Sequence, residues 1–167
     1  MPWNVPPAFT PGQTLTAAAL NAIRDSLNTL GGAWATYTPS WTATVVAPSI
    51  EDGTLVGYHM RAGRLIHFRI VLTGGASTDF GGGPWVLGLP VDAAATSGRL
   101  WVTGTARDDS ASNDYLIGGI IPGGPTLNLR TLPAAAGNSL TNIGATTPFT
   151  WAAGDTLTIS GTYEAAS

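Results

Sequence analysis

The sequence contains no cysteine and no lysine, and charged residues make up only 10% of its 167 residues. The lack of cysteine excludes a disulfide framework, thiolate chemistry and cysteine-ligated metal sites. A phosphate-binding loop of the Walker type needs a lysine that this chain does not possess. The seven cations are all arginines, they form no basic cluster, and the net charge is −3. Nucleic-acid binding therefore has no electrostatic support.

The N-terminal sequence MPWNVPPAF has neither the basic region nor the apolar core of a signal peptide. No uninterrupted apolar run approaches the length of a membrane span. We therefore expect a soluble protein that is made in a cytosol, carries no export signal and has no membrane partner. Gly, Thr, Ser, Ala and Pro take the place of the missing charges, which indicates a β-rich domain with short turns.

Residues 15–32, LTAAALNAIRDSLNTLGG, have the pattern of a short helix with both ends marked. Thr16 is a suitable N-cap, and Leu15 before it is placed to pack on Leu20 as a hydrophobic staple. Gly31 and Gly32 end the helix. Inside it, apolar residues recur at spacings of three, four and three, which gives two heptads of an a/d seam: Leu20, Ile23, Leu27 and Leu30.

A helix of about 14 residues spans only about 21 Å and is marginal alone in water, so its apolar stripe must be buried. It either packs on the downstream β domain as an ordinary amphipathic helix or associates with copies of itself. Leu at the a positions with Ile at d favours three or more strands. The sequence thus predicts a short trimerising helix, with packing on the chain's own domain as the alternative.

Residues 1–14 carry four prolines, which forbid helix and favour an extended arm. Large apolar side chains between prolines suit insertion into pockets, so we expect the arm to dock on another chain rather than fold back on its own domain. The anchoring residues are predicted to be Trp3, Val5, Pro6, Pro7 and Phe9.

Residues 33–167 are predicted to form an antiparallel β-sandwich or jelly roll, because short alternating runs are separated by Gly, Pro, Asp and Asn. The clearest hairpin joins residues 55–61 to 64–72 around Ala62-Gly63, with Ile66, Phe68, Ile70 and Leu72 on one face. An extended segment at 33–44 is broken at Pro39. Further strands are expected at 85–89, 99–105, 115–121, 126–132, 149–151 and 156–163.

Enzymatic chemistry has little support in the sequence. A nucleophilic triad would have to use His59 or His67, and no GxSxG elbow exists. A two-residue hairpin loop places these histidines on opposite faces, whereas a three-residue loop would bring them to one face. The acidic cluster Asp108, Asp109, Asn113 and Asp114 is expected to be a solvated loop, or else to hold an adventitious cation. We expect no catalytic residue, no metal site and no cofactor.

Aromatic side chains offer one further kind of site. Trp85, Trp101 and Trp151 lie among Gly and Thr and are candidates for stacking on sugar rings. Tryptophan is also common in the cores of β-sandwiches, so core packing is the favoured interpretation for each of them.

Several stretches carry a resemblance to a known class of proteins. The N-terminal PPAFTPGQTLTAAALNAIRDSLNTL resembles the start of many small structural proteins of tailed bacteriophages, especially those of actinobacterial hosts. YTPSWTAT, GTLVGYHMRAGRLIHFRIVLTGG, GPWVLGLPV and FTWAAGDTLTISGTYEA are similar to the head domains of tail-fibre and minor tail proteins. The resemblance implies an arm that attaches to the tail or capsid, a trimerising helix and an outward-facing jelly-roll head.

The expected function is therefore that of a non-enzymatic virion structural protein, displayed as a homotrimer on the particle exterior. Its partners would be itself and another virion protein, either a tail protein or the major capsid protein, held through the arm. A minor tail or fibre component is favoured over a capsid decoration protein of the head-fibre type. An alternative of another class is a carbohydrate-binding module for host attachment, whose partner is a cell-surface glycan.

Overall fold

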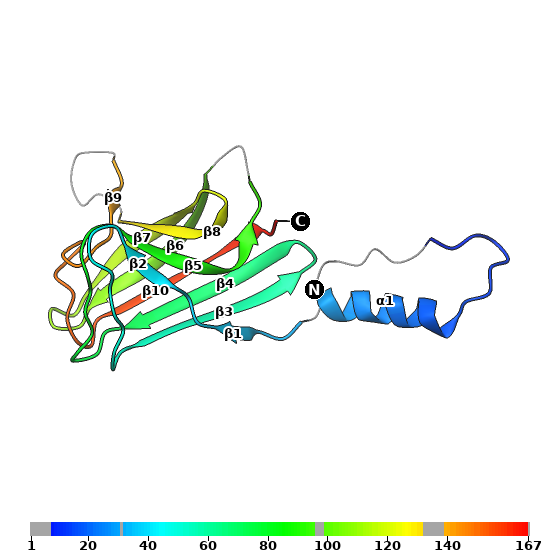
Figure 1. Cartoon of the computed structure of the whole chain (residues 1–167), viewed down its shortest axis with the longest axis horizontal. Helices are drawn as coiled ribbons and strands as arrows, with labels where there is room; N and C mark the ends of the chain where they lie inside the picture. Colours follow the sequence, from blue (N-terminus) through cyan, green and yellow to red (C-terminus); the bar gives the residue numbers. More distant parts are fainter. Residues whose placement is uncertain (1–7, 31, 96–98, 132–138, 167) are drawn as a thin grey trace.

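The computed structural model describes residues 8–30, 32–95, 99–131 and 139–166 (Figure 1). Within these residues the chain forms one helix followed by ten strands. The elements are α1 (Ala17–Leu30), β1 (Ala35–Tyr37), β2 (Trp41–Ala43), β3 (Thr54–Ala62), β4 (Leu65–Thr73), β5 (Trp85–Ala93), β6 (Leu100–Asp108), β7 (Asn113–Ile121), β8 (Gly124–Thr131), β9 (Thr141–Asn142) and β10 (Thr156–Glu164).

The start of α1 follows from local sequence. Thr16 Oγ1 accepts a hydrogen bond from the backbone N–H of Ala19 at 3.2 Å, which confirms the predicted N-cap. Just before it, the backbone N–H of Gln13 donates to the carbonyl of Thr10 across a tight turn in which Gly12 has a φ of +85°. The expected staple partners Leu15 and Leu20 both remain more than half exposed.

All ten strands join one antiparallel sheet in the order β1-β3-β4-β10-β6-β7-β8-β5-β2, with β9 paired to β8. β1 and β2 are the two edges, yet only three residues separate them in sequence. One extended segment, residues 35–43, thus pairs with β3 at one end of the strand order and with β5 at the other, so the sheet must curl (Figure 1). Tyr37 at the end of β1 donates a hydrogen bond from Oη to the carbonyl of Gly88 on β5 at 3.3 Å. The expected mainly β, antiparallel fold and the break near Pro39 are confirmed.

The hairpin of β3 and β4 has the predicted faces but a different register. Ala62 pairs with Leu65, so the two loop residues are Gly63 and Arg64 rather than Ala62 and Gly63. Gly63 has a φ of +61°, and glycine at the first loop position is what a type II′ turn requires. The shift is by two residues, so every side chain keeps its face. The face of β4 expected to be apolar is buried along its whole length.

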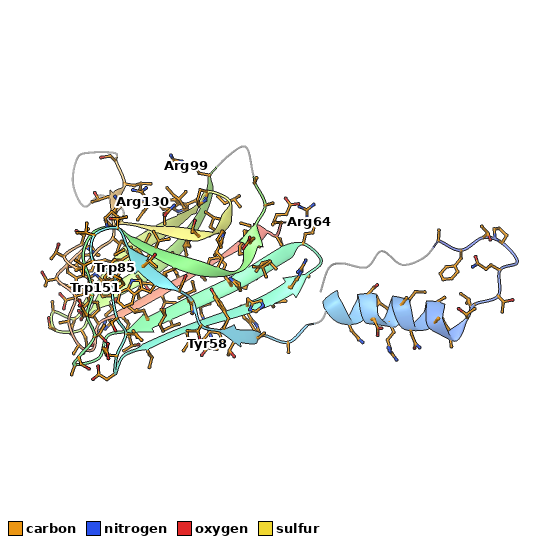
Figure 2. The ribbon with its side chains drawn as sticks, viewed as in Figure 1. Tyr58, Arg64, Trp85, Arg99, Arg130 and Trp151 are labelled. Atoms are coloured by element: carbon orange, nitrogen blue, oxygen red, sulfur yellow. The ribbon has the colours of Figure 1, made fainter. Side chains whose placement is uncertain are left out.

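Aromatic side chains fill the end of the core that lies away from the helix, where Figure 2 labels Trp85 and Trp151. The ring centroids of these two residues are 5.1 Å apart, and Phe149 lies 4.6 Å from Trp151. The strand expected at 149–151 is wrong, because these residues belong to a loop. Trp151 is held there by its Nε1, which donates to the carbonyl of Thr147 at 3.2 Å.

A buried tyrosine connects β10 to β5. Tyr163 donates from Oη to the carbonyl of Val91 at 2.6 Å and accepts from the backbone N–H of the same residue at 3.3 Å. Burial raises the pKa of Tyr163 to about 12. These two hydrogen bonds link strands that are not neighbours in the sheet, so they help to hold the curl.

Candidate functional site: an exposed helix seam and an open sheet face

The helix α1 stands away from the curled sheet, as Figure 1 shows, and its contacts with the sheet are chiefly with β3. Of the predicted seam, Leu20 is 51% exposed and Leu27 is 61% exposed, while Ile23 is partly buried. Leu30 is the last residue of the helix, and its side chain lies outside the described part of the structure. The sheet therefore leaves the leucines of this stripe open to another molecule.

The side of α1 next to the leucine stripe is more shielded. Ala19, Ala22 and Ile23 are partly buried, and Ser26 is buried and donates from Oγ to the carbonyl of Ala22 at 2.9 Å. Beside the seam, Arg24 and Asp25 form an exposed ion pair at 2.9 Å. The helix therefore presents no net charge that would repel a second copy of itself.

The arm is only partly described. Residues 8–16 lie at the end of α1 that is far from the sheet (Figure 1), and Phe9 among them is exposed. The other predicted anchoring residues, Trp3, Val5, Pro6 and Pro7, lie outside the described residues. The arm and α1 also carry large exposed apolar side chains, the residue type that protein interaction surfaces use when such side chains form a patch: Phe9, Leu15, Leu20 and Leu27.

The three tryptophans considered for sugar stacking lie in different surroundings. Trp85 is 1% exposed and Trp151 is 5% exposed, so core packing is confirmed for both and neither offers a ring to a ligand. Trp101 on β6 is 41% exposed and lies on the outer face of the sheet. Only Trp101 of the three is placed to stack on a sugar.

The two histidines lie on opposite faces, as the two-residue loop predicts. His59 pairs with Phe68, whose side chain faces the core, and burial lowers the pKa of His59. His67 lies on the outer face, where its Nδ1 is 3.0 Å from Thr162 Oγ1 and its ring meets Trp34 edge-on. The two rings therefore cannot bind one metal ion together.

The acidic residues near the β6–β7 turn are engaged locally. Asp109 and Asp114 both form ion pairs with Arg107, at 3.5 and 3.3 Å. Asp108 accepts a hydrogen bond from the Ser110 hydroxyl at 2.7 Å, and this bond lowers the pKa of the Asp108 carboxyl. Among the described residues, no group of three or more His, Cys, Asp or Glu side chains is placed to hold a metal ion.

Comparisons with known proteins give no relative: no protein-family model, no curated protein and no solved structure matches this chain significantly. Within the part of the chain that the structure describes, no helix has the length and apolar character needed to cross a membrane.

Proposed function

We propose that this chain is a non-enzymatic structural protein of a tailed-phage virion, which assembles as a homotrimer through α1 and is displayed on the particle exterior. The observation that carries the proposal is the open leucine stripe on a helix that stands away from the sheet. An isolated helix of this length is marginal in water, so the stripe needs a partner.

Three parallel copies of α1 would bury Leu20 and Leu27 at a positions and Ile23 at a d position. Leu at a with Ile at d favours trimers and tetramers over dimers. Arg24 lies between the two leucines and carries a positive charge. It already forms an ion pair with Asp25, so the copies of α1 would not repel one another through this residue when they associate. A trimer is therefore the oligomer that these side chains support best.

The head of each subunit is proposed to be jelly-roll-like, with the two halves of the curled sheet as its two layers. β6, β7 and β8 are consecutive neighbours and β5 lies beside β8, which is a Greek-key arrangement of the kind found in most β-sandwiches. The arm, residues 1–14, is proposed to dock on a tail protein or on the major capsid protein. Three arms on one trimer would bind a repetitive surface with avidity.

The native mass of the purified protein, measured by light scattering, tests the assembly. A mass of three chains is expected, and a monomer at micromolar concentration would refute the helix-mediated trimer. Immunogold labelling of purified particles tests the location. Label at the tail supports a minor tail or fibre component, label spread over the heads supports capsid decoration, and unlabelled particles would refute a virion role.

Deleting residues 1–13 separates anchoring from assembly. The shortened chain should keep the mass of a trimer, because α1 and its Thr16 cap remain. It should fail to join particles, because the proposed anchor is gone. Normal incorporation of the shortened chain would show that the arm is not the anchor.

A further inference from the structure

A row of side chains crosses the outer face of the sheet at one level. Thr103 on β6, Gly118 on β7, Arg130 on β8 and Asn142 on β9 are direct cross-strand partners of one another in turn. Residues opposite each other on one face lie about 5 Å apart, so the row forms one continuous surface. The row belongs to the head and contains no residue of the helix.

The exposed ring of Trp101 covers the glycine in this row. A Cβ atom added to Gly118 would lie 2.1 Å from Cζ2 of Trp101 and 2.7 Å from the two atoms beside it, so the ring occupies the space of the missing side chain. One side of the ring therefore rests on β7, and 41% of the residue remains exposed. The glycine thus lets an aromatic surface lie on the sheet with one side open to solvent.

Arg130 lies directly beside this ring in the register and has unused hydrogen-bonding capacity. Its Nη1 donates to Oδ1 of Asn142, while its Nε is buried and has no hydrogen-bond partner in the described part of the chain. The bond from Arg130 uses the amide oxygen of Asn142 and leaves the amide N–H groups of Asn142 as donors. Because Nε is enclosed by the protein, a ligand would reach Arg130 through its two Nη nitrogens, which carry four of the five N–H donors of the guanidinium.

The row contains an arginine and no carboxylate, although the whole chain has a net charge of −3. The carboxylates of the outer face lie at its ends, where Asp114 pairs with Arg107 and Glu164 pairs with Arg64. Among the described residues, Arg130 forms no ion pair with a carboxylate. Figure 2 shows Arg99, which precedes β6, on the same upper side of the sheet as Arg130.

We propose that the outer face of β6, β7 and β8 binds an acidic saccharide. A sugar ring packs its apolar face on Trp101, and the guanidinium of Arg130 binds the carboxylate or phosphate group that the saccharide carries. Asn142 and the Thr103 hydroxyl bind sugar hydroxyls. Arginine suits this role because its planar donors match both carboxylate and phosphate oxygens. The proposal does not depend on the helix-mediated assembly.

Isothermal titration of the full chain at low salt tests the proposal with defined probes. A hyaluronan decasaccharide supplies carboxylates, and glucosylated poly(glycerol phosphate) supplies phosphates. Maltohexaose serves as the neutral saccharide and polyglutamate as the anion without sugar. Binding of one or both acidic saccharides, at least tenfold tighter than maltohexaose and polyglutamate, is expected, and the stronger of the two identifies the acidic group.

Variants then place the binding on this face. Trp101→Thr and Arg130→Gln should each weaken acidic-saccharide binding at least tenfold. Trp34→Thr, which removes another exposed tryptophan, and Arg107→Gln, which removes a paired arginine of β6, should change it less than twofold. Gly118→Ala keeps both recognition residues but forces the ring from its place, so it should also weaken binding, and it replaces Trp101→Thr if that variant does not fold.

Three results would overturn the proposal. The first is no measurable binding of either acidic saccharide. The second is polyglutamate binding as tight as that of the saccharides, which would reduce the site to charge alone. The third is an effect of Trp101→Thr other than the loss of binding. Binding that is unchanged in this variant would show that Trp101 does not hold the sugar, and a lower native mass would show that the face is a contact between copies of the chain.

Discussion

Replacing Leu20 and Leu27 by glutamine tests whether the open stripe of α1 holds the proposed trimer together. Glutamine has nearly the helix propensity of leucine, so the change removes apolar surface without weakening the helix itself. The two leucines are exposed by 51% and 61% in the single chain, and association would bury the exposed part of each.

Full burial of a leucine contributes about 1.5–3 kcal/mol, so burying the open half contributes about 1 kcal/mol for each side chain. Six such side chains in a trimer contribute about 6 kcal/mol, which corresponds to about four orders of magnitude in the association constant. Glutamines at these positions would also have to give up water on association. The double variant should therefore be monomeric at micromolar concentrations at which the natural chain is trimeric.

Light scattering across a hundredfold range of concentration measures the effect, and far-UV circular dichroism checks that the β signal is kept. Leu116→Gln is the matched control, because Leu116 is 59% exposed but lies on the sheet. The control should keep the mass of the natural chain. A double variant with the same mass as the control would refute the role of the stripe, whatever the oligomer turns out to be.

Other predictions concern stability and its dependence on pH. Tyr163→Phe leaves both backbone groups of Val91 without their partner, so the free energy of unfolding measured with urea should fall by about 1–3 kcal/mol; an unchanged midpoint would contradict the proposed link. Because the pKa of Tyr163 is raised to about 12 and an unfolded tyrosine titrates near about 10, stability should decrease as the pH rises between these values, and less so in Tyr163→Phe. Asp155 is buried and accepts two backbone N–H groups, so Asp155→Ala should lower the thermal midpoint by several degrees, and no shift would mean that those groups find water instead. Burial lowers the pKa of His59, so as the pH falls below about 6.5 the unfolded chain takes up a proton before the folded chain does. The free energy of unfolding should therefore decrease as the pH falls below that value and should keep this contribution in full above it. In His59→Gln this dependence on pH should be lost.

Local sequence patterns predicted the helix start and the strand faces better than the register of the hairpin that joins two strands. The Thr16 cap and the alternation of Ile66, Phe68 and Ile70 depend on neighbours within one turn or one strand, and both are confirmed. The hairpin register was wrong because Ala62-Gly63 and Gly63-Arg64 are both acceptable loops by composition. The backbone decides between them, since Gly63 adopts a positive φ at the first loop position.

The strand expected at 149–151 failed for a similar reason. Alternating aromatic residues indicate a strand when only the sequence is considered. In the structure Trp151 packs on Trp85 and Phe149 packs on Trp151, and both residues reach these contacts from a loop. Both a strand and a loop can bury the rings of Phe149 and Trp151, so the apolar pattern does not distinguish the two conformations.

Residues a few positions apart were enough to predict the start of the helix, its apolar stripe and the antiparallel β structure that follows it. These features depend on side-chain periodicity and on turn residues a few positions apart. The pairing of strands that are far apart in the chain places the last strand, β10, between β4 and β6, and it joins residues 35–43 to both ends of the strand order. It also decided that Trp85 is buried while Trp101 is open, because the face on which a side chain lies depends on pairing between strands far apart in the chain.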